Sequence, residues 1–137
     1  MPAFKKLFLV DDDADDRMFF AEVIQQIDRG IQLNTSVNAM EAKQYLETTD
    51  QLPELIFLDY NMPVMNGLEY LLWLKKQLRF REIPVVMFTT SGEHREKCYD
   101  AGADWYIVKP NTAKELFNQL NALLTEGFGP LKLASEN

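Results

Sequence analysis

The sequence predicts an α/β fold in which helices cover both faces of a parallel sheet. Five short apolar segments alternate along the chain with five segments whose apolar residues recur every three or four positions. Alternating strands and helices of this kind build parallel sheets that are buried on both faces. The chain has 137 residues, of which 47% are hydrophobic, so we expect one domain with a sizeable core.

The expected strands are short apolar segments bounded by polar or turn-forming residues. The first runs into an acidic stretch that begins at Asp11, and Pro84 introduces the fourth. The second alternates apolar and polar residues, which predicts a strand with one polar face. The five expected strands span residues 5–10, 31–37, 55–58, 85–88 and 105–108.

The expected helices follow apolar stripes, and several have recognisable ends. The first stops at residues 28–30, Asn38 caps the second, residues 63–67 turn into the third, the fourth spans 93–101, and the fifth begins at Thr112 and ends at Gly127. The stripe of the third helix is expected to contain Leu68, Leu71, Leu72 and Leu78. Five strands connected in this way favour the flavodoxin-like strand order 2-1-3-4-5.

Composition excludes several classes of protein. The formal net charge of −7 argues against a direct nucleic-acid partner. The sequence has no run of 18 apolar residues that could span a membrane, and we expect no secretory signal, because acidic residues follow the first basic ones before an apolar segment forms. The single cysteine, Cys98, has no internal disulfide partner, which suits a reducing cytosol, and we expect it to be buried.

Polar side chains follow four of the five strands, and parallel strands bring their carboxyl ends to one edge of the sheet. Asp11 and Asp12 follow the first strand, Asp59 follows the third, Thr89 follows the fourth and Lys109 follows the fifth. In the order 2-1-3-4-5 the first and third strands are neighbours, so the three acids are expected to meet. Ligands of such folds bind at this edge.

These residue types predict a metal-assisted phosphoryl site. Crowded carboxylates repel one another, and a divalent cation relieves the repulsion. Oxygen ligands supplemented by water suit Mg²⁺. The charge of Lys109 and the hydroxyl of Thr89 complement phosphoryl oxygens. Asp11 and Asp12 form a pair that can hold the ion, whereas Asp59 stands alone, so we expect Asp59 to be the nucleophile of an aspartyl-phosphate.

Four segments, taken together and in this order, closely resemble the receiver domain of two-component response regulators. They are LFLVDD (residues 7–12), LIFLDYNMPVMNG (residues 55–67), PVVMFTT (residues 84–90) and AGADWYIVKP (residues 101–110). The resemblance implies a stand-alone cytoplasmic phosphoprotein of phosphorelay signal transduction, a switch rather than an enzyme. It assigns residues 1–126 to the receiver domain and 127–137 to a short C-terminal tail, with no output domain.

The resemblance also implies a role for each matching residue. Asp59 is expected to be the phospho-acceptor, Asp12 a direct Mg²⁺ ligand and Asp11 an acid that holds the ion, often through water. Asn61 is expected to give its backbone carbonyl to the metal. Three further residues surround the phosphoryl group in this scheme: Thr89 as the switch hydroxyl, Lys109 as the phosphate partner, and Tyr106 as the aromatic ring that reports the state. The bond between Lys109 and Pro110 is expected to be cis.

The same resemblance predicts the partners. A sensor histidine kinase or a phosphotransfer protein would donate the phosphoryl group, and an unidentified downstream protein would read the surface of the fourth helix, fifth strand and fifth helix. The chain would act as a monomer or as a phosphorylation-dependent dimer.

Two alternatives stay open at this point. A Mg²⁺-dependent phosphatase of the haloacid-dehalogenase type also uses an aspartate, a threonine and a lysine, and Asp11 and Asp13 fit its D-x-D pattern. Ala14 and Asp15 follow, however, where such enzymes have a glycine and a threonine. The other alternative is a receiver-shaped scaffold that takes no phosphoryl group, against which the complete set of polar residues argues.

Three nearby polar residues are expected to have structural roles only. Asp13 is left out of the metal site, Ser91 is expected to cap the fourth helix, and His94, the only histidine, is expected to be an exposed helix residue.

Overall fold

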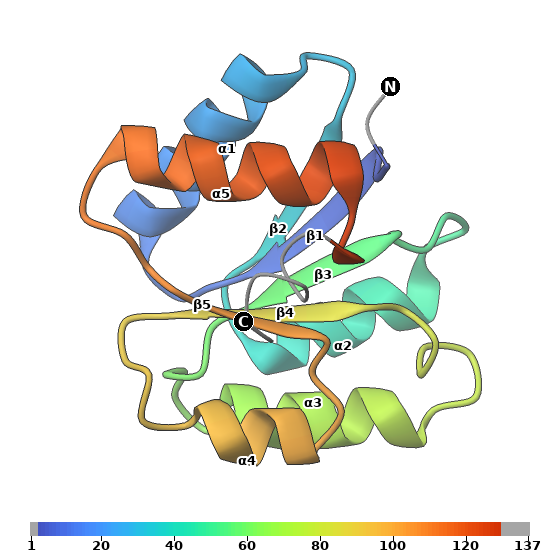
Figure 1. Ribbon diagram of the computed structural model, residues 1–137. Coiled ribbons are helices and arrows are strands. Elements are labelled where there is room, and N and C mark those ends of the chain that lie inside the picture. The colour runs from blue at the N-terminus through green and yellow to red at the C-terminus, as the bar shows by residue number, and fades with distance from the viewer. Residues whose placement is uncertain (1–2, 130–137) are drawn as a thin grey trace.

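One parallel sheet of five strands runs through the middle of the molecule (Figure 1). The structure, a computed structural model, describes residues 3–129. Its strands are β1 (Lys6–Val10), β2 (Gln32–Ser36), β3 (Leu55–Leu58), β4 (Val85–Thr89) and β5 (Trp105–Val108). They lie in the order β2-β1-β3-β4-β5, and every neighbouring pair is parallel. The predicted fold class and the strand order 2-1-3-4-5 are confirmed.

Helices cover both faces of this sheet. The helices are α1 (Ala14–Ile27), α2 (Ala39–Thr48), α3 (Gly67–Lys76), α4 (Arg95–Asp100) and α5 (Ala113–Glu126). Helices α1 and α5 lie side by side on one face, and α2, α3 and α4 lie on the other (Figure 1). Because β3 and β4 have a helix layer on both sides, their side chains are buried on both faces, whereas the edge strand β2 is largely polar and exposed.

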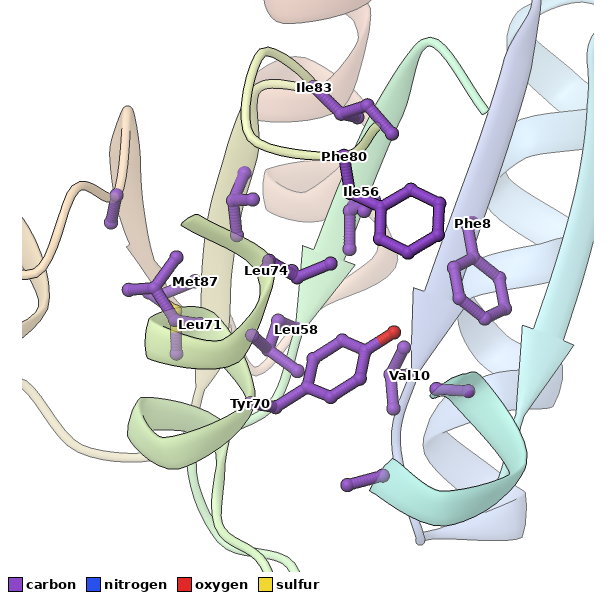
Figure 2. Packing of buried hydrophobic residues seen from close by; sticks show 14 of the residues in the cluster. Phe8, Val10, Ile56, Leu58, Tyr70, Leu71, Leu74, Phe80, Ile83 and Met87 are labelled. Atoms are coloured by element: carbon purple, nitrogen blue, oxygen red, sulfur yellow. The ribbon is translucent and has the colours of Figure 1, made fainter. Parts of the chain in front are cut away.

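Alternate residues of a strand enter the two cores that result. On β1, Leu7 and Leu9 pack with the residues of α1 and α5, whereas Phe8 and Val10 pack with those of α2 and α3. Figure 2 shows part of the core between the sheet and helices α2 and α3, in which Tyr70 of α3 lies against β1 and β3. Each fully buried leucine or phenylalanine stabilises the fold by about 2 kcal/mol, so both layers hold the sheet edge in place.

Side-chain caps define the start of four helices. Asp13, Asn38, Asn66 and Thr112 each accept a hydrogen bond from the backbone N–H three residues later. At α3 the arrangement is reciprocal, because Glu69 also accepts from the backbone N–H of Asn66. The cap expected at Asn38 and the helix start expected at Thr112 are confirmed, and Asp13 is the N-cap of α1.

The predicted stripe of the third helix is wrong at two positions. The buried residues of α3 are Gly67, Tyr70, Leu71 and Leu74, which recur at the three- and four-residue spacing of one helix face. Leu72 lies off that face and is 42% exposed. Leu78 lies beyond the end of α3 and is 78% exposed.

The fourth helix is shorter than expected and begins later. It spans only Arg95–Asp100, and its first residue follows His94, which makes no side-chain cap. The cap predicted at Ser91 is therefore wrong. The hydroxyl oxygen of Ser91 instead accepts from the backbone N–H of Glu93, within the loop that precedes the helix.

No helix among residues 3–129 is long and apolar enough to cross a bilayer. Of the predicted C-terminal tail, residues 130–137 lie outside the described residues.

Candidate functional site

Hydrogen bonds between neighbouring strands hold the predicted polar residues at one edge of the sheet. The backbone N–H of Asp11 donates to Ser36 at 3.1 Å, and that of Asp59 donates to Val10 at 3.0 Å. The backbone N–H of Lys109 donates to the carbonyl oxygen of Thr89 at 2.7 Å. Asp11, Asp59 and Lys109 therefore come directly after their strands, where the backbone is still hydrogen-bonded to a neighbouring strand.

Three carboxylates meet at this edge. Oxygens of Asp11, Asp12 and Asp59 all lie within 4.8 Å of one another. Asp11 is fully buried and Asp59 is 4% exposed, whereas Asp12 is open to solvent. Such a set of hard oxygen donors, with one member facing water, fits a divalent cation such as Mg²⁺ that keeps part of its water shell.

The ammonium of Lys109 reaches into the same cluster. Its Nζ lies 2.8 Å from Asp11 Oδ2 and 3.4 Å from Asp59 Oδ2, and only 10% of the side chain is exposed. A third carboxylate, that of Asp16, also lies 2.8 Å from Nζ. Sequence reasoning missed Asp16. The available signal was its position in the first turn of the helix that follows Asp11, which starts at the same edge.

Burial and charge perturb two pKa values here. Burial raises the pKa of the Asp11 carboxyl to about 6, although hydrogen bonds from Lys109 and from the backbone of Asp13 act in the opposite direction. For Lys109, burial favours the neutral amine, but the hydrogen bonds to Asp11 and Asp16 and the charge of Asp59 outweigh it, so its pKa is raised. Lys109 is therefore a permanent cation among more numerous acids.

Thr89 has a buried hydroxyl with no partner. The residue is fully buried, and its Oγ1 makes no hydrogen bond to any atom in the described part of the chain. A buried hydroxyl without a hydrogen bond costs about 1–3 kcal/mol. An oxygen-rich ligand at the sheet edge would remove that cost.

Asp59 makes the longest polar contacts of the buried acids. Its Oδ1 accepts from the backbone N–H of Asn61 at 3.3 Å, and its Oδ2 lies 3.4 Å from Lys109. Both oxygens of Asp11, in contrast, accept at 2.9 and 2.8 Å, from Asp13 and Lys109 respectively. Asn61 is exposed in the loop beside the acids, and its predicted role as a carbonyl ligand stays a prediction.

Gly67 brings the first turn of α3 against the backbone of Asp59. A Cβ at this position would lie 2.3 Å from the carbonyl oxygen of Asp59 and 2.8 Å from Cα of Tyr60. The backbone N–H of Gly67 donates to Tyr60 at 2.8 Å. Only glycine allows this approach, which fixes the loop that carries Asp59.

Tyr106 is buried behind the site. It is 4% exposed, its hydroxyl donates to the backbone carbonyl of Ser91, and the guanidinium of Arg95 lies 5.1 Å from its ring centroid. The tyrosine therefore contacts the loop after β4, and its predicted switching role stays a prediction. The cis bond expected between Lys109 and Pro110 is wrong, because no peptide bond in residues 3–129 is cis.

His94 is not the exposed helix residue that the sequence predicted. Its ring stacks on that of Tyr60, with centroids 3.6 Å apart and planes within 4°. The side chain is 18% exposed, and its Nε2 lies 3.1 Å from a carboxylate oxygen of Glu93. Local sequence gave no sign of this stack, because the two residues belong to loops that follow different strands.

Comparison with known proteins gives the family. Residues 7–121 match the response regulator receiver domain. Chemotaxis protein CheY1 of Helicobacter pylori is 34% identical over 126 residues, which cover 87% of this chain and 96% of CheY1. The phosphate regulon transcriptional regulatory protein PhoB of Klebsiella pneumoniae is 34% identical over 126 residues, covering 88% of this chain and 52% of PhoB.

The chain thus spans about half the length of the PhoB relatives that it matches. Among solved structures, the phosphorylated cyanobacterial phytochrome response regulator RcpA superimposes with a TM-score of 0.81 at 31% identity. The superposition covers 92% of this chain and 94% of RcpA. The match over most of the chain, and the two-way coverage with CheY1 and RcpA, show that the chain belongs to the response regulator receiver domain family of two-component signalling.

Proposed function

We propose that this chain is the phospho-acceptor switch of a two-component phosphorelay and that Asp59 accepts the phosphoryl group. In the reaction a carboxylate oxygen of Asp59 forms a bond to phosphorus while the P–N bond of a phosphohistidine breaks. The electron pair of that bond stays on the leaving imidazole nitrogen. The observation that carries the proposal is the buried ammonium of Lys109 between Asp11 and Asp59, beside three clustered carboxylates.

The contacts of the acids support Asp59 as the nucleophile. A carboxylate oxygen must be available to attack, and the long contacts of Asp59 at 3.3 and 3.4 Å restrain its oxygens least. Asp11 is fully buried, and both of its oxygens are held by shorter hydrogen bonds. Asp12 is exposed, which suits a ligand of a hydrated cation better than a nucleophile in a dry site.

The donor set supports Mg²⁺ as the cofactor, with Asp11, Asp12, Asp59 and the backbone carbonyl of Asn61 as the residues that would hold it. When bound, the ion would offset the negative charge that the phosphoryl oxygens bring to the acids. Lys109 does the same from the other side, because its raised pKa keeps it charged at any pH the protein meets. The fixed cation needs no reorganisation during transfer.

Thr89 and Tyr106 supply the readout in this proposal. A phosphoryl group offers the hydroxyl of Thr89 the acceptor that it lacks, and this draws the end of β4 toward Asp59. Tyr106 holds the backbone of Ser91, two residues further on, through its own hydroxyl. A shift of that loop therefore changes the position of Tyr106 and the surface of α4, β5 and α5, which a downstream protein can recognise.

A sensor histidine kinase or a phosphotransfer protein is the proposed donor, which implies a cytoplasmic location. The excess of acids over bases favours a protein partner over nucleic acid, since the formal net charge is −7. The chain signals by protein–protein contact, and it acts as a monomer or as a phosphorylation-dependent dimer.

Labelling with a small phosphodonor tests the proposal. With radioactive acetyl phosphate and Mg²⁺ we expect close to one phosphoryl group per chain, stable in acid and labile in base. EDTA and Asp59→Asn should each abolish the label. Stoichiometric labelling that survives Asp59→Asn would contradict the assignment of the acceptor, and no labelling of the wild type would leave only the scaffold alternative.

The phosphatase alternative predicts a different outcome. A phosphatase of the haloacid-dehalogenase type would use Asp11 as its nucleophile and release many equivalents of inorganic phosphate from a small phosphate ester. The full burial of Asp11 and its two short hydrogen bonds disfavour that role. We therefore expect no multiple turnover of p-nitrophenyl phosphate by the wild type or by Asp59→Asn.

A further inference from the structure

The ammonium of Lys109 has an acceptor for each of its three hydrogens. Its partners are carboxylate oxygens of Asp11 at 2.8 Å, Asp16 at 2.8 Å and Asp59 at 3.4 Å. An ammonium group carries three N–H donors and no acceptor, so this side chain has no further hydrogen bond to give. A phosphoryl oxygen on Asp59 takes over the 3.4 Å contact with that carboxylate, and a second phosphoryl oxygen can bind Lys109 only if Asp11 or Asp16 gives way.

Asp16 is directed to Lys109 by an unusual arrangement at the start of α1. An acid three residues after an N-cap normally accepts from the N-cap backbone N–H, as Glu69 does from Asn66 in this protein. At α1 the N-cap is Asp13, and its backbone N–H donates to Asp11 Oδ1 instead. The carboxylate of Asp16 is thereby left for Lys109, while its backbone N–H is held by Asp13 at 2.9 Å.

We propose that Asp16 is a positioning residue that holds Lys109 in the resting protein and releases it when Asp59 carries a phosphoryl group. This inference rests on the proposed function, because it assumes that the phosphoryl group arrives at Asp59. Phosphoryl oxygens add acceptors and negative charge on the side of Lys109 that faces Asp59. The ammonium turns toward them and gives up its contact with the helix.

Exposure decides whether the contact with Asp11 or the contact with Asp16 breaks. The side chain of Asp16 is 38% exposed, compared with 0% for Asp11 and 6% for Asp59. A released Asp16 is rehydrated at little cost, whereas a released Asp11 would be a buried charge without a partner. Asp16 also lies outside the group of three acids that can share a cation, so its release leaves the metal ligands in place.

The contact with Asp16 therefore stabilises the resting state against the phosphorylated one. A ligand that binds only after Lys109 has left Asp16 must break this contact. The free energy of the contact is therefore subtracted from its binding free energy, and its affinity is lower. Without the carboxylate, Lys109 is already available to the phosphoryl oxygens. Asp16 thus controls the affinity of the site for a phosphoryl group on Asp59, although it does not contact that group.

Binding of beryllofluoride with Mg²⁺ tests this inference in the full chain, because beryllofluoride mimics a phosphoryl group on a carboxylate. We expect Asp16→Asn to bind it about fivefold more tightly than the wild type at saturating Mg²⁺. The matched control is Asp15→Asn, which removes the same charge from the same helix turn at a solvent-exposed residue. General electrostatics affects both variants, so the difference between them measures the contact with Lys109.

Two further readouts separate positioning from a structural role. Asp16→Glu keeps a carboxylate and should return the affinity toward the wild-type value. In EDTA, Asp16→Asn should unfold more readily than Asp15→Asn, because it loses the resting contact. A merely structural residue would lower stability without tightening beryllofluoride.

The outcomes distinguish the two proposals. Wild type that binds no beryllofluoride would overturn the proposed function and this inference with it. Wild type that binds, together with an Asp16→Asn variant that binds no more tightly than Asp15→Asn, would overturn the role of Asp16 alone.

Discussion

Gly67, the first residue of α3, lies directly against the carbonyl of Asp59. An added Cβ would come within 2.3 Å of that oxygen, and the atoms it meets belong to backbone rather than to a flexible side chain. The start of the helix and the acceptor loop therefore fix each other. Any side chain at position 67 must displace the residue that we propose to be phosphorylated.

Gly67→Ala is accordingly expected to impair both stability and phosphorylation. We expect a loss of about 2 kcal/mol in the free energy of unfolding, because the clash forces a backbone shift. Labelling by acetyl phosphate should slow by about tenfold or more, since a misplaced nucleophile is costly. Urea unfolding and the initial rate of labelling measure the two effects.

Gly129→Ala is the matched control, because nothing lies within 4 Å of a Cβ built there. It should change neither quantity. A Gly67→Ala protein with wild-type stability and labelling rate would contradict the close approach.

Thr89→Val should have opposite effects on the resting and phosphorylated states. The substitution keeps the shape of the side chain and removes a fully buried hydroxyl that has no partner among the described residues. In EDTA the free energy of unfolding should be unchanged or raised by about 1 kcal/mol. The affinity for beryllofluoride should fall by about tenfold or more, because a hydrogen bond to a charged group is lost.

Thr90→Val provides the comparison, since Thr90 is the next residue and is exposed. It should leave beryllofluoride affinity close to that of the wild type. Equal affinities of the wild type and Thr89→Val would mean that the hydroxyl does not meet the phosphoryl group.

The sequence was sufficient for the sheet and for most of the site because both depend on local patterns. Apolar segments between helical stripes determine a parallel sheet, and a parallel sheet brings residues that follow its strands, such as Asp59 and Lys109, to one edge. The missed features depend on distances between segments. Asp16 could not be assigned to Lys109 without the distance between the first turn of α1 and the residue that follows β5, and the stack of His94 on Tyr60 joins two loops.

The pH dependence of stability in the metal-free protein should carry the signature of Asp11. Its pKa is raised from 3.8 to about 6 by burial, so the folded state binds more protons than the unfolded state between these values. The protonated carboxyl therefore makes its full contribution to stability below about pH 4. This contribution is lost as the pH rises through about 6 and Asp11 ionises. In EDTA, the unfolding free energy of Asp11→Asn minus that of the wild type should therefore increase from pH 4.5 to 7.5.

We expect Asp11→Asn to gain about 1–2 kcal/mol relative to the wild type between pH 4.5 and 7.5, since the raised pKa of Asp11 is already the net of burial and of the pairing with Lys109. Asp12→Asn, at an exposed position of the same cluster, should gain less over that range because an exposed carboxylate stays hydrated. An advantage of Asp11→Asn that shrinks as the pH rises would contradict the raised pKa.

Tyr70 presents a second buried hydroxyl whose removal should stabilise the protein. It is fully buried in α3, and its hydroxyl points toward β1 between the side chains of Phe8 and Val10 (Figure 2). Within residues 3–129 nothing is in position to accept or donate a hydrogen bond to it. Burial also raises the pKa of this phenol, so it stays neutral.

Tyr70→Phe keeps the ring packing and removes only the oxygen. The free energy of unfolding should rise by about 1 kcal/mol, because the unfolded state no longer gains by hydrating this hydroxyl. Tyr45→Phe, at a partly exposed ring on α2, should change the stability by less than about 0.5 kcal/mol. Labelling of Asp59 should be unaffected in both variants. A clear loss of stability in Tyr70→Phe would show that the hydroxyl has a hydrogen-bond partner inside the core.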